Sequence, residues 1–287
     1  MQRSFEQQLS TKYSGLSTKL REAAEFVLEH PVDVATRSLR AVSKDANLSP
    51  ATFSRMSTAL GYDSYEELRD TLRRSVEHRV NSFSDRMEAL QEDHDEGDTG
   101  FLTRHVHDCS TNVQLMERSI DPNRLEACVD RLHRARRVLV FGALGSTGVA
   151  EYLVYMASFL TEKWSMANPT GASLASKLVG MSGTDVLIVI TKPPFASRAI
   201  RAAREAQAAG AYVLVLTDTW SCPALAHASA SFVVPTDSRH FFSSYASTLV
   251  LCEIIIGMLA GRAGPPARRR IREVEDRNRS LSEVWEG

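Results

Sequence analysis

Residues 38–60 read SLRAVSKDANLSPATFSRMSTAL, and this stretch decides the fold of the first part of the chain. Leu39, Val42 and Ala46 recur at spacings of three and four, which is the spacing of one face of a helix. Asn47 follows, and asparagine tolerates the left-handed backbone that a tight turn requires. We therefore predict a short helix from about residue 38 to residue 46 that ends in a tight turn.

A second short helix is predicted directly after this turn. Ser49 can cap its first turn, and Pro50 fits the first helical position. Phe53 and Met56 lie three residues apart, so both should point back to a core. Gly61 should end the helix. Two short helices joined by a tight turn form a helix-turn-helix, which places its second helix in the major groove of DNA.

The open side of this motif is the predicted DNA-binding surface. Small polar side chains at the start of the second helix can approach base edges, and Arg55 can reach a phosphate or a guanine. With Arg37 included, four basic side chains against Asp45 give this face a charge of +3, whereas the net charge of the chain is only −1. The predicted DNA contacts are Arg40, Lys44, Ser49, Ala51, Thr52, Ser54 and Arg55. A plain helical hairpin is the alternative.

The segment around the motif, residues 1–80, is predicted to be entirely helical. Ser17 is a plausible N-cap, His30-Pro31 should stop the helix that follows it, and Ser64 should cap a last helix. Residues 81–102 contain an acidic, glycine-punctuated run and are predicted to be a solvated linker or a frayed helix end.

Residues 103–287 alternate between apolar runs and helical patterns. The runs lie at 138–141, 186–190, 213–216 and 231–234, with a weaker strand at 163–166, and the helical patterns lie at 147–161, 171–180, 196–209 and 222–229. Continuous apolar strands that alternate with helices form a parallel sheet covered on both faces. The fold class is therefore α/β, with an all-α N-terminal domain joined to a parallel-sheet C-terminal domain.

The loop after the first predicted strand is a candidate anion site. Gly142 and Gly145 allow a tight turn there, and Ser146 and Thr147 offer hydroxyls beside the start of a helix. Because ligands bind at the carboxyl ends of the strands in an open parallel sheet, the effector site is expected at this loop. The loop lacks the Gly-x-Gly-x-x-Gly fingerprint, so no dinucleotide cofactor is expected.

The chain resembles the RpiR-type regulators over nearly its whole length. The resemblance rests on Leu-x-x-Val-(x)5-Leu-Ser-Pro-Ala-Thr-Phe-Ser-Arg, which ends at Arg55, and on Ala-Leu-Gly-Tyr-x-Ser-Tyr-x-Glu-Leu, which ends at Leu68. It continues through a C-terminal sugar isomerase (SIS) domain. The resemblance implies a flavodoxin-like sheet, a homodimer or dimer of dimers, a palindromic operator in double-stranded DNA and a sugar phosphate or related effector.

The loop after the second apolar run departs from the SIS pattern. SIS domains usually have Ser-x-Ser-Gly-x-Thr there, and in this register only Thr191 keeps its hydroxyl. Pro193-Pro194 replaces a serine and a glycine, and proline has no backbone donor. Lys192 and Ser197 are expected to compensate in part, with Lys192 acting as a point charge. The expected effector is therefore a sugar phosphate or another anionic carbohydrate or acid.

The loop after the last strand adds further candidates. Arg239 and His240 are expected to close over a ligand. For Phe241, Phe242 and Tyr245 we expect a structural role at the start of the following apolar helix.

Other classes of function are less well supported by the sequence. An isomerase would need a base beside the substrate carbonyl, and only Glu151 and His240 offer one, so no catalytic residue is assigned. A third possible function, beside the effector-controlled regulator and the isomerase, is that of a DNA-binding dimer that needs no ligand. The four cysteines have no metal-ligand spacing, so neither a metal site nor a disulfide framework is expected. The polar start and the short apolar run 249–260, which contains Glu253, predict a cytoplasmic protein without a membrane span.

Overall fold

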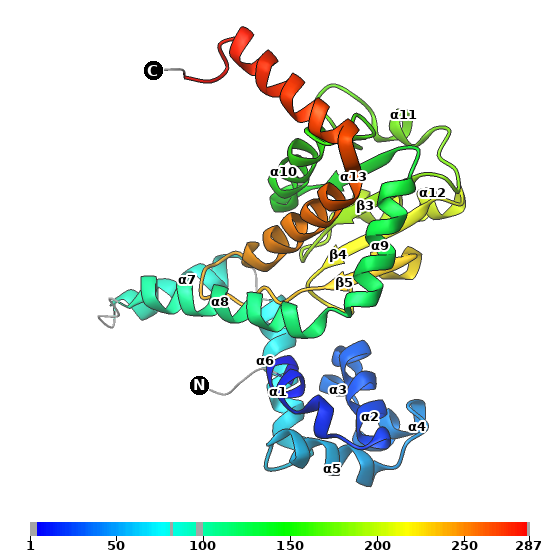
Figure 1. The fold of residues 1–287 in the computed structure, drawn as a ribbon. Helices are drawn as coiled ribbons and strands as arrows, with labels where there is room; N and C mark the ends of the chain where they lie inside the picture. The colour runs from blue at the N-terminus through cyan, green and yellow to red at the C-terminus, as the bar shows by residue number, and fades with distance from the viewer. Residues whose placement is uncertain (1–4, 81–82, 96–99, 286–287) are drawn as a thin grey trace. The chain divides into compact units, whose positions relative to one another are not determined.

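The computed structural model describes residues 5–80, 83–95 and 100–285 (Figure 1). They form two compact units. The N-terminal unit falls within Met1–Ser119 and also includes Pro235–Ser244. The sheet unit comprises Ile120–Val234 and the chain from Tyr245 onward.

The N-terminal unit begins with six α-helices, as the sequence predicts for this segment. They are α1 (Phe5–Lys12), α2 (Thr18–Glu29), α3 (Pro31–Thr36), α4 (Leu39–Asp45), α5 (Pro50–Leu60) and α6 (Tyr65–Val80), with a 3-10 turn η1 (Tyr13–Gly15) after α1. Phe53 of α5 lies at the centre of their core, because its ring packs edge-on against both Phe26 and Tyr65. The expected stop at His30-Pro31 is present, but Pro31 also opens the unpredicted helix α3, since proline suits a first helical turn.

The helix-turn-helix has the local geometry expected from its sequence. The Ser38 Oγ accepts a hydrogen bond from the Ala41 N–H at the start of α4, and the Ser49 Oγ accepts one from the Thr52 N–H at the start of α5. Asn47 in the turn has φ 53°, and Gly61 after α5 has φ 97°. Each hydroxyl satisfies a backbone donor that would otherwise be unpaired at a helix start. Ser17 occupies the N-cap position of α2 without a side-chain hydrogen bond.

Helices also occupy much of the segment expected to be a linker. Residues 83–95 form α7 (Phe83–Asp95), and α8 (Phe101–Ser119) follows. Pro235–Ser244 packs against α8. The Asn112 side chain donates to the Asp237 carbonyl over 2.7 Å, and Arg239 lies 3.6 Å from Asp108. The domain boundaries proposed from the sequence, 80/81 and 102/103, stay predictions.

The sheet unit contains a five-stranded parallel sheet, and its strand positions agree with the sequence analysis. The strands are β1 (Val138–Gly142), β2 (Trp164–Met166), β3 (Val186–Ile190), β4 (Tyr212–Thr217) and β5 (Ala230–Val233), in the order β2-β1-β3-β4-β5. The order reverses between β1 and β3. This is the strand order of the flavodoxin-like fold, whose topological switch point lies between these two strands.

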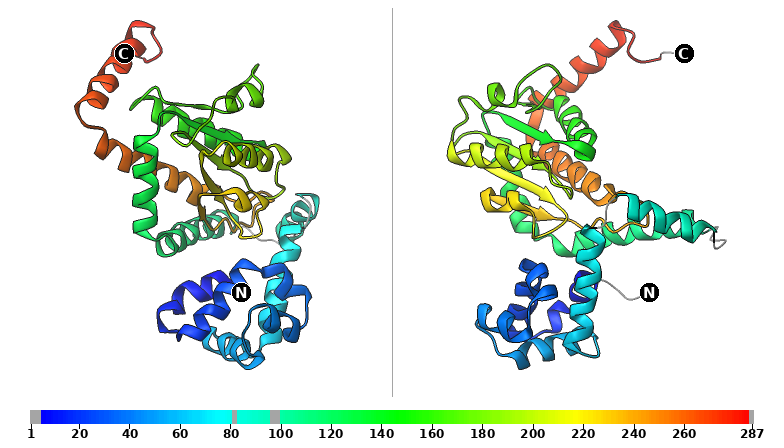
Figure 2. Two further views of the ribbon diagram at one scale, coloured as in Figure 1. Left: turned by 90° about the vertical axis from the view of Figure 1, so that its right-hand side faces the viewer. Right: turned by 180° about the vertical axis from the view of Figure 1, so that it is seen from behind.

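Helices cover both faces of this sheet (Figures 1 and 2). On one face α12 (Ser197–Ala208) packs against β1, β3 and β4, with α11 (Leu174–Leu178) and the 3-10 helix η3 (Pro223–His227) beside it. On the other face α10 (Thr147–Ser158), α13 (Ala246–Ser280) and α9 (Pro122–Arg134) pack together. Strands β1 and β3 are buried at every residue, which explains why their sequences are unbroken apolar runs.

The last helix, α13, bends at one point. Gly264 adopts φ 64° and ψ −160°, a conformation outside the helical region, and Pro265 and Pro266 follow. Of the described residues, only α13 is long and apolar enough to span a membrane by length and composition. Leu251, Cys252 and Ile255 in its first half are fully buried in the core of the sheet unit.

Candidate functional site

The predicted DNA-binding surface is mostly exposed. Arg40, Lys44, Ser49, Ala51, Ser54 and Arg55 all lie at the surface. The Arg55 Nε donates to the Ala51 carbonyl over 3.3 Å, so the guanidinium lies along the outer side of α5. Arg37 is paired with Asp45 over 2.7 Å. The positive charge of this face is therefore carried by Arg40, Lys44 and Arg55.

Thr52 differs from its predicted placement. Its side chain is only 5% exposed, and its hydroxyl lies 2.9 Å from the Ser49 Oγ. The placement of Thr52 on the open side is therefore wrong. Because the Ser49 cap draws the Thr52 hydroxyl into the first turn of α5, this side chain stabilises the helix start.

The turn after β1 is built around Gly142. A Cβ at this position would lie 2.3 Å from the Ser146 carbonyl oxygen and 2.7 Å from the Ala150 Cβ. The Gly142 carbonyl accepts hydrogen bonds from the Asn168 amide at 2.8 Å and from the Thr147 hydroxyl at 3.4 Å. Only glycine permits so close an approach between the strand end and the start of α10.

Leu144 lies in the same turn, between Gly142 and Gly145. Its φ is 54°, in the left-handed region that leucine rarely adopts, and its side chain is 66% exposed. Gly145, which we expected to allow this tight turn, is not among the residues with positive φ. The loop thus keeps a glycine-like backbone at a position that carries a leucine.

Tyr245 joins the two loops of the switch point. Its hydroxyl lies 2.9 Å from the Ser146 Oγ, and the Lys192 Nζ lies 3.7 Å from the centre of its ring. We expected only a structural role for Tyr245, but the residue also contacts both predicted effector loops. Gly145 lies directly against it: a Cβ there would be 3.2 Å from the Tyr245 hydroxyl.

Lys192 is a buried cation at the end of β3. The residue is 5% exposed, and burial lowers the pKa of its amine to about 7, although Asp218 and Cys252 act in the opposite direction. A lysine with this pKa changes charge near neutral pH. Asp218, which follows β4, was not identified from the sequence; its position at a strand end was the available signal.

The loop after β3 holds two further candidates. Thr191 is buried, and its N–H donates to the Leu216 carbonyl of the neighbouring strand. Ser197 is exposed at the first position of α12. The peptide bond between Pro193 and Pro194 is cis.

Arg239 and His240 belong to the N-terminal unit. Arg239 faces Asp108 of α8, and the His240 ring stacks on Phe241. Burial, with the nearby charge of His105, lowers the pKa of His240. Their predicted part in closing over a ligand stays a prediction. Among the described residues, no group of three His, Cys, Asp or Glu side chains is arranged to hold a metal ion.

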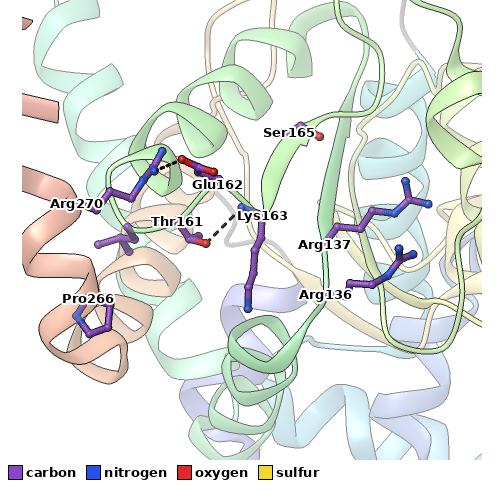
Figure 3. A pocket seen from close by; sticks show the side chains of 9 residues that line it. Arg136, Arg137, Thr161, Glu162, Lys163, Ser165, Pro266 and Arg270 are labelled. Atoms are coloured by element: carbon purple, nitrogen blue, oxygen red, sulfur yellow. Dashed lines mark hydrogen bonds and ion pairs between the residues drawn. The ribbon is translucent and has the colours of Figure 1, made fainter. Parts of the chain in front are cut away.

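A cavity of about 600 Å³ lies at the opposite, amino-terminal edge of the sheet (Figure 3). Its lining includes Arg137, Lys163 and Arg270. The Arg270 guanidinium is bound to Glu162 over 2.6 Å and to the Ser158 carbonyl over 2.7 Å. This edge lies away from the carboxyl ends where open sheets bind their ligands, so we do not assign the effector to it.

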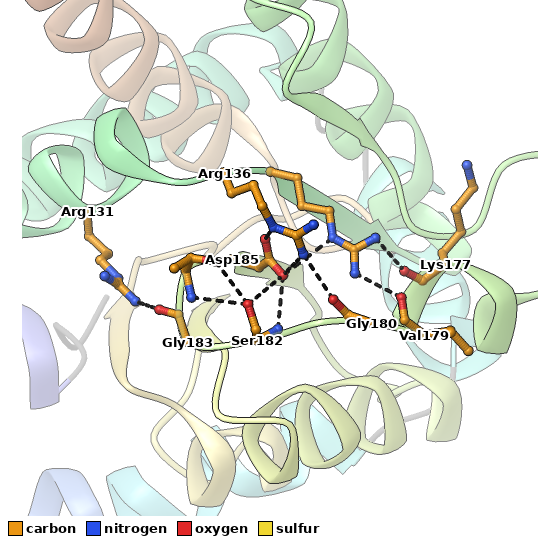
Figure 4. Close-up of polar contacts among 10 residues, drawn as sticks. Arg131, Arg136, Lys177, Val179, Gly180, Ser182, Gly183 and Asp185 are labelled. Atoms are coloured by element: carbon orange, nitrogen blue, oxygen red, sulfur yellow. Dashed lines mark hydrogen bonds and ion pairs between the residues drawn. The ribbon is translucent and has the colours of Figure 1, made fainter.

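The Asp185 carboxylate organises the same edge (Figure 4). Its side chain is fully buried, and Arg136 binds both of its oxygens, over 2.9 and 2.6 Å. Arg137 approaches it to 3.5 Å and donates to the Lys177 and Val179 carbonyls. This network fastens the starts of β1 and β3 to the loop between them.

Comparison with known proteins finds a family model that matches each half of the chain. A model of the helix-turn-helix domain of the rpiR family matches residues 3–79, and a model of the SIS domain matches residues 131–258. The HTH-type transcriptional regulator HexR of Pseudomonas aeruginosa is 23% identical over 274 residues, covering 93% of this chain and 94% of that protein.

Two solved structures show the same fold. The NanR protein of Vibrio vulnificus, complexed with ManNAc-6P, has a TM-score of 0.57 and 20% identity, covering 97% of this chain and 99% of that one. The sugar isomerase domain of an RpiR transcription factor from Sphaerobacter thermophilus has a TM-score of 0.59 and 21% identity, covering 62% of this chain and 99% of that one. With its helix-turn-helix at residues 38–60 and its SIS sheet, the chain belongs to the RpiR-type transcriptional regulators.

Proposed function

We propose that this regulator binds a palindromic operator as a homodimer or dimer of dimers in the cytoplasm, and that a small anionic metabolite sets its operator affinity. The observation that carries the effector site is the buried amine of Lys192, which contacts the same tyrosine as Ser146 at the switch point of the sheet. A buried cation beside a hydroxyl-bearing loop suits an anion.

In this proposal the two loops have different tasks. Gly142 and Gly145 shape the turn after β1, where Ser146 and Thr147 offer hydroxyls to the anion. Lys192 supplies the positive charge from the end of β3. Thr191 and Ser197 flank it, and Arg239 and His240 are candidates for closing over the ligand.

The effector class is a sugar phosphate or a related anionic carbohydrate or acid. The solved complex of NanR with ManNAc-6P supports this class, because a protein of the same fold there holds a phosphorylated sugar. The two prolines after Lys192 remove backbone donors that the common SIS loop supplies. We therefore expect this regulator to rely on Lys192 more than on backbone groups.

Arg55→Ala is expected to weaken operator binding by roughly 5- to 150-fold, since a lost arginine–guanine contact costs about 1–3 kcal/mol. The measurement is fluorescence anisotropy of the full chain with the intergenic DNA upstream of its own gene. Lys19→Ala is the control, because Lys19 is an exposed cation of α2, outside the helix-turn-helix. Equal affinities for wild type and Arg55→Ala would contradict the proposed docking of α5.

Anion binding is expected to weaken about tenfold between pH 6 and pH 8. A lysine with a pKa of about 7 falls from roughly 90% to roughly 10% charged across this range. Sulfate is a suitable probe because its own charge stays constant, and calorimetric titration gives its affinity. Lys192→Met should bind sulfate weakly at both pH values. A Lys192→Met variant with wild-type affinity would exclude this site, and a lack of response to any anion would favour the ligand-independent dimer.

A further inference from the structure

The Tyr245 side chain occupies the space in front of the loop after β1. Its hydroxyl is hydrogen-bonded to Ser146 over 2.9 Å and lies against Gly145. Ser146 is only 1% exposed. The hydroxyl that an anion would need is therefore already engaged by a side chain of the same unit.

The tyrosine ring also covers the amine of Lys192. The Nζ lies 3.7 Å from the ring centre, which is a cation–π contact. Burial raises the pKa of Tyr245, so its hydroxyl keeps its proton at neutral pH and can hydrogen-bond as an uncharged group. One side chain thus engages both groups that the effector requires.

The position of Tyr245 in the chain connects this contact to the N-terminal unit. Tyr245 directly follows the segment Pro235–Ser244, which belongs to that unit, and it directly precedes α13. Within the N-terminal unit, α8 holds the segment through Asn112 on the Asp237 carbonyl at 2.7 Å and Cys109 beside the Ser244 hydroxyl at 3.4 Å.

We propose that Tyr245 is an internal occupant of the effector site, which the anionic effector displaces on binding. The proposal rests on the effector site proposed above and adds the residue that gates it. The anion takes over the hydrogen bond of Ser146 and replaces the ring as the partner of Lys192. Because Tyr245 is covalently joined to Pro235–Ser244, its displacement passes to the segment that α8 holds. Binding of the effector thereby biases the unit that carries the DNA-binding helices.

An internal occupant lowers the apparent affinity of its competitor, because the effector binds only to the fraction of molecules whose site is open. Tyr245→Phe removes the hydroxyl on Ser146 and keeps the ring. Since a hydrogen bond between neutral groups contributes modestly to stability, the variant should bind an anion roughly 2- to 10-fold more tightly than wild type.

The test titrates inorganic phosphate into the full-length protein, with ³¹P NMR as the readout. Tyr155→Phe is the matched control, because Tyr155 is 62% exposed on the neighbouring helix α10. Ser146→Ala reports on the site itself and should bind phosphate weakly. Tighter binding by Tyr245→Phe, with Tyr155→Phe unchanged, supports the proposal.

Two results overturn the proposal and can be told apart. If Ser146→Ala loses phosphate and Tyr245→Phe binds as wild type or more weakly, the effector site stands and the internal occupant is excluded. If neither the wild type nor any variant binds phosphate, or if Ser146→Ala binds it like wild type, the proposed effector site is excluded as well.

A second experiment needs no variant: iodination of wild-type Tyr245 is measured against that of Tyr155 by mass spectrometry. Saturating phosphate should increase the iodination of Tyr245, and an unchanged or decreased yield contradicts displacement.

Discussion

Replacing Gly142 by alanine is expected to lower the free energy of unfolding by about 1–3 kcal/mol, the range for overpacking a filled site. The new Cβ would lie 2.3 Å from the Ser146 carbonyl oxygen and 2.7 Å from the Ala150 Cβ. Ser146 directly precedes α10 and Ala150 lies in its first turn, so the turn can make room only by moving the loop that carries Ser146 and Thr147. Anion binding should be lost together with the stability.

Thermal unfolding and phosphate titration measure the two effects, and Gly148→Ala is the matched control. Gly148 lies six residues further on, within α10, and a Cβ there meets nothing within 4 Å. Because alanine is favoured over glycine inside a helix by about 0.5–1 kcal/mol, this variant should be equally stable or more stable. If both substitutions had the same effect, the close approach at Gly142 would not be what holds the loop.

Local signals explain why the helix-turn-helix was predictable from the sequence. Apolar spacing, the serines at both helix starts, Asn47 and Gly61 all act within a few residues of their own position. Thr52 was misplaced, although it lies in the same stretch. Its hydroxyl had two possible environments, solvent or the Ser49 cap, and the periodicity of the helix does not distinguish them.

The strands were predictable for a similar reason, but the site was predictable only in part. A run such as Val186–Ile190 is apolar at every residue because helices cover both faces of the sheet. Ser146 and Lys192 follow such runs, so strand ends identified them. Tyr245 is brought to them by tertiary packing, and no local pattern records a contact between residues 146 and 245.

The backbone at Leu144 shows another limit of pattern comparison. From the sequence, Gly142 and Gly145 were the residues expected to allow the tight turn. In the structure Leu144 itself adopts the left-handed conformation. A left-handed leucine is strained, and such strain persists only where the surrounding structure holds it in place. Here Gly142 and the Ser146–Tyr245 contact flank it on both sides.

Asp185→Asn is expected to lower the free energy of unfolding by about 2–3 kcal/mol at neutral pH, since it breaks charge-assisted hydrogen bonds of a buried carboxylate. The carboxylate accepts from Arg136 on both oxygens and from the Ser182 N–H at 2.9 Å. An amide offers one acceptor only, and its NH₂ group would face the donors of Arg136. The starts of β1 and β3 would therefore lose their common anchor.

The pH dependence of this difference provides a second test. Burial alone would raise the pKa of Asp185, but the hydrogen bonds of Arg136 and Ser182, with the charges of Arg136 and Arg137, outweigh it and hold the pKa below its ordinary value. A carboxylate with a lowered pKa in the folded state contributes its stability above its unfolded pKa, about 3.9, and loses it as the pH falls through the folded value. The difference in the free energy of unfolding between wild type and Asp185→Asn, measured by urea unfolding, should thus be full from pH 5 to pH 7 and should narrow below about pH 4.

Glu205→Gln is the control. It removes an exposed partner of Arg204 and should change the free energy of unfolding by less than about 0.5 kcal/mol at any of these pH values. A gap that stayed constant down to pH 3 would mean that the carboxylate charge is not what Asp185 contributes.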